Sequence, residues 1–332
     1  MTIPNIQHSD IQNIAILRLG TLGDAMLTTP LYSALKDLFP DARITVFASE
    51  WNAVIAENHA AVNTVVRIPG GFAGLGTWIR TLFTGTKFDL YIDPKDHRST
   101  TSRFVAECIR AHDKLVAPGN LPLLSSAEIV PPPAAEHFTD SALAPLAVLD
   151  PDRTFERRPS INIPEDAHRN MQKIILQEKF YLVNVSAGSP TRRWTEEKWK
   201  QVVEALPFTE RIIVISGPDD SDMARRIAGS RRSADYVQTG NLMEAAALIE
   251  QAQGLITSDT SVVHLASAFN TPIVALYFNA PHMMAKFSPL SDIQRIVLAR
   301  GQEPVSTISV EEVLTAICET FTNQDPEPEH GN

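Results

Sequence analysis

The sequence predicts an α/β protein with two Rossmann-like domains, each built on a parallel sheet. Short apolar runs alternate with amphipathic helical patterns along most of the chain, which indicates strand–helix units with parallel pairing and right-handed crossovers. A proline-rich stretch between residues 118 and 164 interrupts the alternation. The chain has 332 residues, which is long for one core and natural for two domains.

The first half begins with an apolar strand at 14–19 that runs into Gly20-Thr-Leu-Gly23-Asp24. We expect the two glycines to form a tight turn and Asp24 to begin a helix. The turn is neither a dinucleotide fingerprint nor a Walker loop, because the G-x-G-x-x-G spacing and a Gly-Lys-Ser/Thr sequence are absent. Later strands are expected at 43–48, 62–68, 87–92 and 114–117, and helices at 51–58, 99–111 and 136–149.

The second half repeats the alternation of strands and helices. Strands are expected at 181–186, 211–216, 254–257 and 273–278, and helices at 196–206, 221–227, 242–251, 262–269 and 310–321. The predicted division is an N-terminal domain at 1–155, a C-terminal domain at 156–309, a last helix at 310–322 and a disordered tail at 323–332.

Composition excludes several classes of protein. The net charge of −10 argues against a general nucleic-acid binder, because binding a phosphate backbone normally needs a basic face. The two cysteines, Cys108 and Cys318, lie far apart in helical patterns, which favours a reducing compartment over a disulfide framework or a metal site. The N-terminus does not resemble a signal peptide, and no apolar run is long enough to span a membrane. We therefore expect a cytoplasmic protein with no transmembrane segment.

The stretch from Gly254 to Phe278 is the most informative part of the chain. It is typical of a buried strand, a sharp turn, a short helix and a second strand. Capping side chains at 258–261 precede the helix, and a helix N-terminus at the carboxyl end of a strand favours an anion. Taken alone, Asp259 is more often a helix cap and His264 more often a core residue. Together they favour a phosphate or ribose site.

Two Rossmann-like halves would bring the carboxyl ends of both sheets to a common cleft. The first half would supply Gly20, Gly23, Asp24, Lys95 and Arg98. The second half would supply hydroxyls, backbone donors and arginines, which suit a diphosphate. Its members outside the 254–278 stretch are Ser186, Gly188, Ser189, Arg192, Arg193 and Asp219. The arginine pair is equally typical of a solvated surface, and Trp194 and Trp199 are predicted to be core residues.

Three segments carry a resemblance to a known family. LRLGTLGDAMLTTPLYSAL, VNVSAGSPTRRWTEEKW and SDTSVVHLASAFNTPIVALY resemble, in order and spacing, motifs of glycosyltransferase family 9, the heptosyltransferases of lipopolysaccharide core assembly. The resemblance covers most of residues 14–280. It implies the GT-B architecture, in which two Rossmann-like domains face a central cleft. It also implies an ADP-heptose donor, inversion at the anomeric carbon, and no required metal or cofactor. The implied acceptor is a glycolipid or glycan at the inner membrane surface, where the enzyme would bind peripherally.

The same resemblance implies roles for individual residues. Asp24 matches the catalytic base, and Arg192 falls where the family often has a lysine near the donor phosphates. The acceptor side would include Gly23, Lys95 and Arg98. The donor side would comprise Ser186, Gly188, Ser189, Asp219, Gly240, Asn241, Leu242, Asp259, Thr260, Ser261 and His264. Ser261 and Thr195 depart from the family's glycine and proline, and the block 93–99 matches poorly.

Three alternatives stay open at this point. Another GT-B enzyme, such as a UDP-sugar transferase or an epimerase, would share the diphosphate-binding site. It would differ in the loop near Gly240 that binds the nucleotide base. A nicotinamide-dependent oxidoreductase is disfavoured by the missing fingerprint. A catalytically inactive sugar-nucleotide binder is the third alternative. It fits Ser261, which adds a side chain where a diphosphate would approach, but it would have no use for a base at Asp24.

Overall fold

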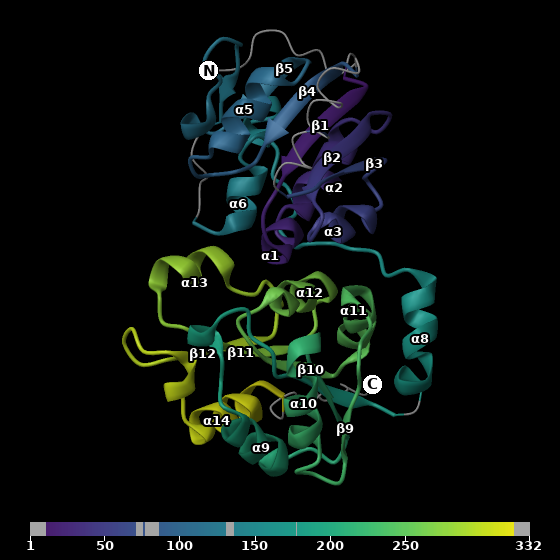
Figure 1. Ribbon diagram of the computed structural model, residues 1–332, viewed down its shortest axis with the longest axis vertical. Coiled ribbons are helices and arrows are strands. Elements are labelled where there is room, and N and C mark those ends of the chain that lie inside the picture. Colours follow the sequence, from purple (N-terminus) through teal and green to yellow (C-terminus); the bar gives the residue numbers. More distant parts are fainter. Residues whose placement is uncertain (1–10, 71–75, 77–85, 131–135, 177, 322–332) are drawn as a thin grey trace, which may run out of the picture. The chain divides into compact units, whose positions relative to one another are not determined.

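The computed structural model describes residues 11–70, 76, 86–130, 136–176 and 178–321. The chain divides into two compact units, Met1–Asn162 with Ala285–Phe287, and Ile163–Met284 with Ser288–Asn332. Each unit contains a six-stranded parallel sheet with helices around it (Figure 1). The predicted α/β class with two Rossmann-like sheets is therefore confirmed. The tail expected to be disordered, 323–332, lies outside the described residues.

The sheet of the first unit has the order β3-β2-β1-β4-β5-β6. Its strands are β1 (Asn13–Arg18), β2 (Arg43–Ser49), β3 (Thr64–Ile68), β4 (Phe88–Asp93), β5 (Ala111–Val116) and β6 (Glu128–Ile129). The order reverses between β1 and β4, so this unit has its topological switch point there. Ligands of open α/β sheets bind outside the carboxyl ends of the strands at such a point.

The helices of the first unit are short. They are α1 (Leu22–Met26), α2 (Thr29–Leu38), α3 (Ala53–Glu57), α5 (Thr100–Cys108), the 3-10 helix η2 (Pro118–Asn120), α6 (Phe138–Leu143) and α7 (Leu146–Leu149). Strand β1 is buried on both faces, because Ile14 and Ile16 pack in one apolar cluster while Ala15 and Leu17 pack in another. A near-continuous apolar run is expected of a strand covered on both sides.

The sheet of the second unit has the order β12-β11-β10-β7-β8-β9, so its switch point lies between β7 and β10. Its strands are β7 (Phe180–Asn184), β8 (Arg211–Ile215), β9 (Ala234–Tyr236), β10 (Gly254–Ser258), β11 (Ile273–Tyr277) and β12 (Gln294–Leu298). Its helices are α8 (Glu165–Ile175), η3 (Pro190–Arg192), α9 (Glu196–Ala205), η4 (Pro218–Asp220), α10 (Ser221–Ala228), α11 (Leu242–Gln251), α12 (Ser261–Phe269), η5 (Val305–Thr307) and α14 (Val310–Phe321). The helix α13 (Pro281–Phe287) has its last three residues grouped with the first unit.

The two tryptophans that were predicted to be core residues are buried in the second unit. Trp194 and Trp199 are 1% and 0% exposed and pack edge to face. The indole N–H of Trp194 donates to the carbonyl of Ile308 at 3.0 Å. Gly254 begins β10 where the Phe321 ring packs, and a Cβ there would lie 2.7 Å from that ring. A glycine at this position therefore lets α14 dock on the sheet.

The structure corrects the predicted start of the first helix. Asp24 does not begin a helix; it is the third residue of α1, and Thr21 is the N-cap. The expected single helix is two, because Pro30 lies in the first turn of α2. Proline suits a helix start and disrupts a helix interior. The helix expected at 136–149 is likewise divided into α6 and α7.

Several elements were not predicted. Strands β6 and β9 have only two and three residues, and β12 is exposed or half-buried along its length. Such short or exposed strands give little periodicity from which to infer structure. Helix α8 is mostly polar and buries only Ala167 and Met171.

Candidate functional sites

The turn after β1 is held by side chains from the neighbouring strand and helix. The Asn52 amide donates to the carbonyls of Arg18 and Gly20 at 3.2 and 3.3 Å, and the Ser49 hydroxyl donates to Gly20 at 3.3 Å. Gly20 has φ +146°, and a Cβ there would lie 2.7 Å from Oδ2 of Asp24. Glycine is therefore required at this turn for both backbone conformation and space. The other glycine of the motif, Gly23, lies within α1.

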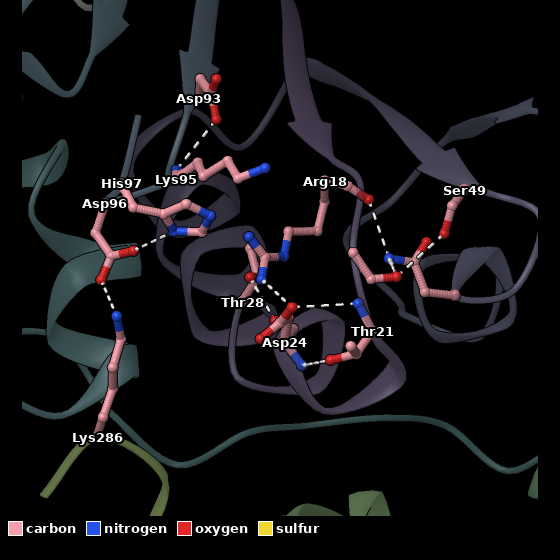
Figure 2. Close-up of polar contacts among 12 residues, drawn as sticks. Arg18, Thr21, Asp24, Thr28, Ser49, Asp93, Lys95, Asp96, His97 and Lys286 are labelled. Carbon is pink, nitrogen blue, oxygen red and sulfur yellow. Dashed lines mark hydrogen bonds and ion pairs between the residues drawn. The ribbon is translucent and has the colours of Figure 1, made fainter. Parts of the chain in front are cut away.

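Asp24 is fixed by a capping box at the start of α1. Its Oδ2 accepts the Thr21 N–H at 3.2 Å, and its own N–H donates to the Thr21 hydroxyl at 3.2 Å. Arg18 lies 3.4 Å from the same Oδ2, as Figure 2 shows. The Asp24 side chain is 26% exposed, so a reactant can reach it. This is the residue that the sequence predicts to be the base.

Arg18 is a functional candidate that the sequence analysis missed. It ends β1 with its side chain 4% exposed, and its guanidinium lies over the Phe138 ring at 4.8 Å from the centroid. Burial lowers the pKa of Arg18, and the charge of Asp24 opposes this shift. Because arginine stays protonated in proteins, Arg18 brings a positive charge into the interior. A single arginine in the apolar run IAILRL is the signal that would have indicated it.

Asp93 is the last residue of β4 and Lys95 follows it, on the other side of the switch point. Asp93 is 1% exposed, and burial raises the pKa of its carboxyl group. Its Oδ1 accepts the Lys95 N–H at 3.1 Å. The buried Asn120 holds the loop beyond, since its amide donates to the carbonyls of Lys95 and His97 and its Oδ1 accepts the Ser99 N–H at 2.8 Å. The sequence analysis missed Asp93 and Asn120 as site residues.

Two pockets meet at these residues. One, of about 140 Å³, is lined by residues of the β1 and β4 ends and of the start of α5, including Arg18, Gly20, Asp93, Lys95, Ser99 and Ser102. The other, of about 350 Å³, shares Asp93 and Lys95 and has mainly apolar walls. Of the predicted acceptor-side residues, Lys95 lines both pockets. Gly23 and the exposed Arg98 line neither of them.

The switch point of the second unit brings Arg192 and Asp259 together. Arg192 ends η3, which follows β7, and Asp259 follows β10; their side chains are 3.2 Å apart. Burial raises the pKa of Asp259, and the charge of Arg192 opposes the shift. Arg193 instead pairs with Asp220 at 2.5 Å. The two adjacent arginines therefore have different partners, and only Arg192 contacts the turn before α12.

The start of α12 differs from the predicted capped helix. Thr260 is its N-cap, but its side chain makes no capping hydrogen bond, and Asp259 pairs with Arg192 instead of capping. Within the described part of the chain, the buried hydroxyls of Ser216, Ser258 and Thr260 have no hydrogen-bond partner. Unsatisfied buried polar groups in a native structure require an explanation, and a polar ligand is one. Ser216 and Ser258 were not predicted as site residues.

The other predicted donor-side residues lie in loops and helices that follow the carboxyl ends of parallel strands. Ser186 accepts the Gly217 N–H at 2.8 Å, and the Ser189 hydroxyl contacts that of Thr191 at 3.0 Å. Gly188 has open space where a Cβ would lie. Asp219 is exposed in η4, Ser261 is the first residue of α12, and His264 is buried within that helix.

Gly240, Asn241 and Leu242 form the start of α11. The Asn241 side chain accepts the Glu244 N–H at 3.0 Å and so caps the helix, whose first residue is Leu242. The buried Glu244 accepts the Gly240 N–H at 2.6 Å and the Asn170 amide at 2.7 Å. This network fixes the loop after β9 and connects it to α8.

Comparison with known proteins identifies the chain's relatives. Residues 151–314 match the model of glycosyltransferase family 9 (heptosyltransferase). Lipopolysaccharide heptosyltransferase 3 of Escherichia coli strain K12 is 24% identical over 328 residues, which cover 89% of this chain and 94% of that protein. Lipooligosaccharide heptosyltransferase 2 of Haemophilus influenzae is 24% identical over 311 residues, which cover 86% and 88%.

Solved structures show the same fold. The glycosyl transferase family 9 protein of Veillonella parvula superposes with a TM-score of 0.80 at 20% identity, covering 95% of this chain and 98% of that chain. The E. coli heptosyltransferase WaaC with ADP superposes with a TM-score of 0.74 at 17% identity, covering 93% and 100%. The predicted GT-B class is therefore confirmed. Among the described residues, no helix combines the length and apolar character needed to cross a membrane.

Proposed function

Because this chain is a glycosyltransferase with a family 9 domain over residues 151–314, we propose that it transfers a heptose-like sugar from ADP-heptose to a lipopolysaccharide core or related glycan acceptor. In this proposal the second unit binds the donor and the first supplies the base and the acceptor site. The reaction inverts the anomeric carbon and requires no metal. The observation that carries the proposal is the Arg192–Asp259 pair beside the uncapped N-terminus of α12.

The donor site is suited to a diphosphate that gains charge as it leaves. The N-terminus of the nine-residue α12 presents the positive end of a helix dipole. Arg192 adds a guanidinium, and the unpartnered Thr260 hydroxyl adds a donor. Two solved heptosyltransferase structures of this fold contain ADP and ADP-2-deoxy-2-fluoro heptose, which supports an ADP-sugar as the donor here.

The proposed reaction is a direct displacement. The acceptor hydroxyl forms a bond to the anomeric carbon, its proton passes to Asp24, and the bond to ADP breaks with its electron pair on the leaving phosphate. Thr21 and Arg18 fix the orientation of the Asp24 carboxylate. Arg192 and the α12 N-terminus would stabilise the charge that develops on the leaving group.

A nucleotide panel tests the donor class. We would measure thermal unfolding with ADP, UDP, GDP and NAD at equal concentrations, because a ligand that binds only the folded state raises the unfolding temperature. ADP should give the largest shift. A preference for UDP would assign the chain to another sugar-nucleotide enzyme, and a preference for NAD would refute the class.

Transfer itself is then measured with ADP-heptose and a heptose-terminated core oligosaccharide. The anomeric configuration of the product, read by NMR, tests inversion, and activity in excess EDTA tests metal independence. If ADP binds but none of a set of ADP-sugars gives a transfer product, the chain is an inactive sugar-nucleotide binder. The glycolipid acceptor, the cytoplasmic location and the peripheral association with the inner membrane surface stay predictions.

A further inference from the structure

We propose that the 140 Å³ pocket between the ends of β1 and β4 binds hydroxyl groups of the acceptor sugar, with Asp93 accepting and Arg18 donating the hydrogen bonds. This inference rests on the proposed function, because it specifies how that reaction's acceptor is held. It gives roles to two residues, Arg18 and Asp93, to which the sequence analysis assigned none.

The first observation is a pair of unsatisfied buried atoms. Nε of Arg18 and Oδ2 of Asp93 have no hydrogen-bond partner among the described residues, and the two side chains are 4% and 1% exposed. Both residues line the same pocket. A buried polar group without a partner is costly, so a ligand that satisfies both atoms would gain this free energy on binding.

The second observation is the opposite polarity of these two atoms. The Arg18 Nε carries a hydrogen to donate, and the Asp93 Oδ2 has lone pairs to accept with. A ligand that carries hydroxyl groups can satisfy both atoms, because each hydroxyl can both accept and donate a hydrogen bond. A phosphate or carboxylate would satisfy Arg18 and meet repulsion from Asp93, while an ammonium would meet the reverse. The charges therefore favour a neutral, hydroxyl-bearing ligand over an ion.

The third observation is the position of the pocket in the fold. It lies at the topological switch point of its sheet, where open α/β sheets bind their ligands. Gly20 lines it, and the Asp24 carboxylate is packed directly against Gly20. A sugar held here by some of its hydroxyls would therefore lie beside the proposed base. The side chain of Lys95 extends from the end of β4 toward Arg18 in Figure 2 and adds a further donor.

Serine side chains line the walls, where the Ser102 side chain hydrogen-bonds to Asp93, and the volume of the pocket limits the ligand's size. Ser99 and Ser102, at the start of α5, line the pocket, and Asn120 fixes the Ser99 backbone. A volume of about 140 Å³ holds a few water molecules or the hydroxyl-bearing edge of one sugar ring. The neighbouring 350 Å³ pocket, which shares Asp93 and Lys95, gives room for the rest of the sugar or for the next residue of the glycan.

The test measures sugar binding directly, without donor. Saturation-transfer NMR would compare methyl α-D-mannopyranoside and its monodeoxy analogues with methyl β-D-glucuronide and inorganic phosphate as anionic probes. We expect the neutral glycoside to bind and at least one deoxy analogue to bind about tenfold more weakly, the equivalent of about 1.4 kcal/mol. Stronger binding of phosphate or the glucuronide at this pocket would overturn the proposal, as would no glycoside binding at all.

Single substitutions of the pocket residues test whether the glycoside binds in this pocket. Asp93→Asn keeps the side-chain shape and replaces the accepting oxygen with a donor, so glycoside affinity should fall about tenfold. Arg18→Lys keeps the charge and removes Nε, and it should weaken binding in the same direction. Asp113→Asn is the control, because Asp113 pairs with His112 on β5 and lines neither pocket. Thermal unfolding of each variant verifies the fold. Unchanged affinity in Asp93→Asn would show that the pocket holds only water.

The glycoside-binding measurement can fail or succeed independently of the proposed function. Glycoside binding requires no ADP-heptose, so an incorrect donor assignment leaves the result interpretable. Conversely, if the chain transfers heptose while Asp93→Asn leaves the KM for the acceptor unchanged, the function stands and the pocket assignment fails.

Discussion

The guanidinium of Arg18 lies 3.4 Å from the carboxylate of Asp24, and only the arginine of this pair is buried. The Thr21 N–H binds the same oxygen, so both of these contacts fall on Oδ2 of Asp24 (Figure 2). If Asp24 is the base, as we propose, Oδ1 is the oxygen that would receive the acceptor's proton. The pair thus combines a fixed orientation with an accessible carboxylate.

Asp24→Ala should lower transfer by about 10²–10⁴-fold, the usual contribution of a general base, while donor affinity changes only a few fold. The measurement is turnover and donor affinity on the same preparation. Glu312→Ala is a matched control in the second unit and should leave turnover unchanged, because Glu312 also accepts the N–H of its cap residue, Ser309, and lies 3.6 Å from an arginine, Arg300. Equal turnover of Asp24→Ala and parent at saturating donor would refute the assignment.

Arg192→Ala should raise the barrier by roughly 2–4 kcal/mol while weakening donor binding less, because its interaction strengthens as the leaving group gains charge. Arg192→Lys should retain more activity, since it keeps the charge and loses only the bidentate geometry. Arg193→Ala is the control, because Arg193 pairs with Asp220 and not with Asp259. If Arg193→Ala were the more damaging substitution, the two arginines would have exchanged roles.

Gly188→Ala should leave the unfolding temperature unchanged, because a Cβ at this position meets no atom within 4 Å. If Gly188 lies in the donor site, as the resemblance to the family implies, the same substitution should weaken ADP binding. Thermal unfolding and ADP titration of one variant measure both quantities. Gly254→Ala is the opposite control: its Cβ would lie 2.7 Å from the Phe321 ring, so it should destabilise the protein by about 1–3 kcal/mol. Unchanged ADP affinity in Gly188→Ala would remove Gly188 from the donor site.

His59 should make the protein less stable in mild acid. Burial lowers the pKa of His59 to about 4, and its ring contacts the hydroxyls of Ser33 and Ser160. The unfolded value is about 6.5, so between these values the unfolded state binds a proton that the folded state does not. Stability is therefore complete above pH of about 6.5 and falls by about 3 kcal/mol as pH drops to about 4.

Urea unfolding of parent and His59→Gln at several pH values measures this effect. The stability difference between the two proteins should shrink as pH falls through the window, because glutamine does not titrate. Carboxylates titrate equally in both proteins and cancel in the comparison. Parallel pH profiles would exclude His59 as the cause.

The sequence predicted most of the fold because the central strands are strongly apolar and the helices between them have clear periodicity. It also predicted that Arg192 and Asp259 would share a site, since both follow strands of a parallel sheet. It did not reveal Arg18 or Asn120, whose roles depend on partners distant in the chain. Phe138 covers Arg18 from a helix 120 residues later, and Asn120 fixes a loop that begins 25 residues earlier. Side-chain contacts over such separations leave no local pattern.

The predicted start of the first helix was wrong for a local reason. The capping side chain of Thr21 competed with Asp24 for the N-cap position, and both residue types are favoured there. At the turn before α12, a partner distant in the chain overrides the local capping pattern. Asp259 is a good capping residue, but an ion pair with Arg192, far away in the chain, fixes its side chain instead.

The shared strand order of the two sheets has a consequence for how this enzyme can diversify. Each sheet has its own apolar core, so the loops at one switch point can change without repacking the other. Recombination near residues 162 and 163 would exchange most of the proposed acceptor module, and residues 285–287, which belong to the same unit, would have to be exchanged with it. A lineage could thereby acquire new glycan linkages while continuing to use one activated sugar, and protein engineers could follow the same route with chimeras joined at that point.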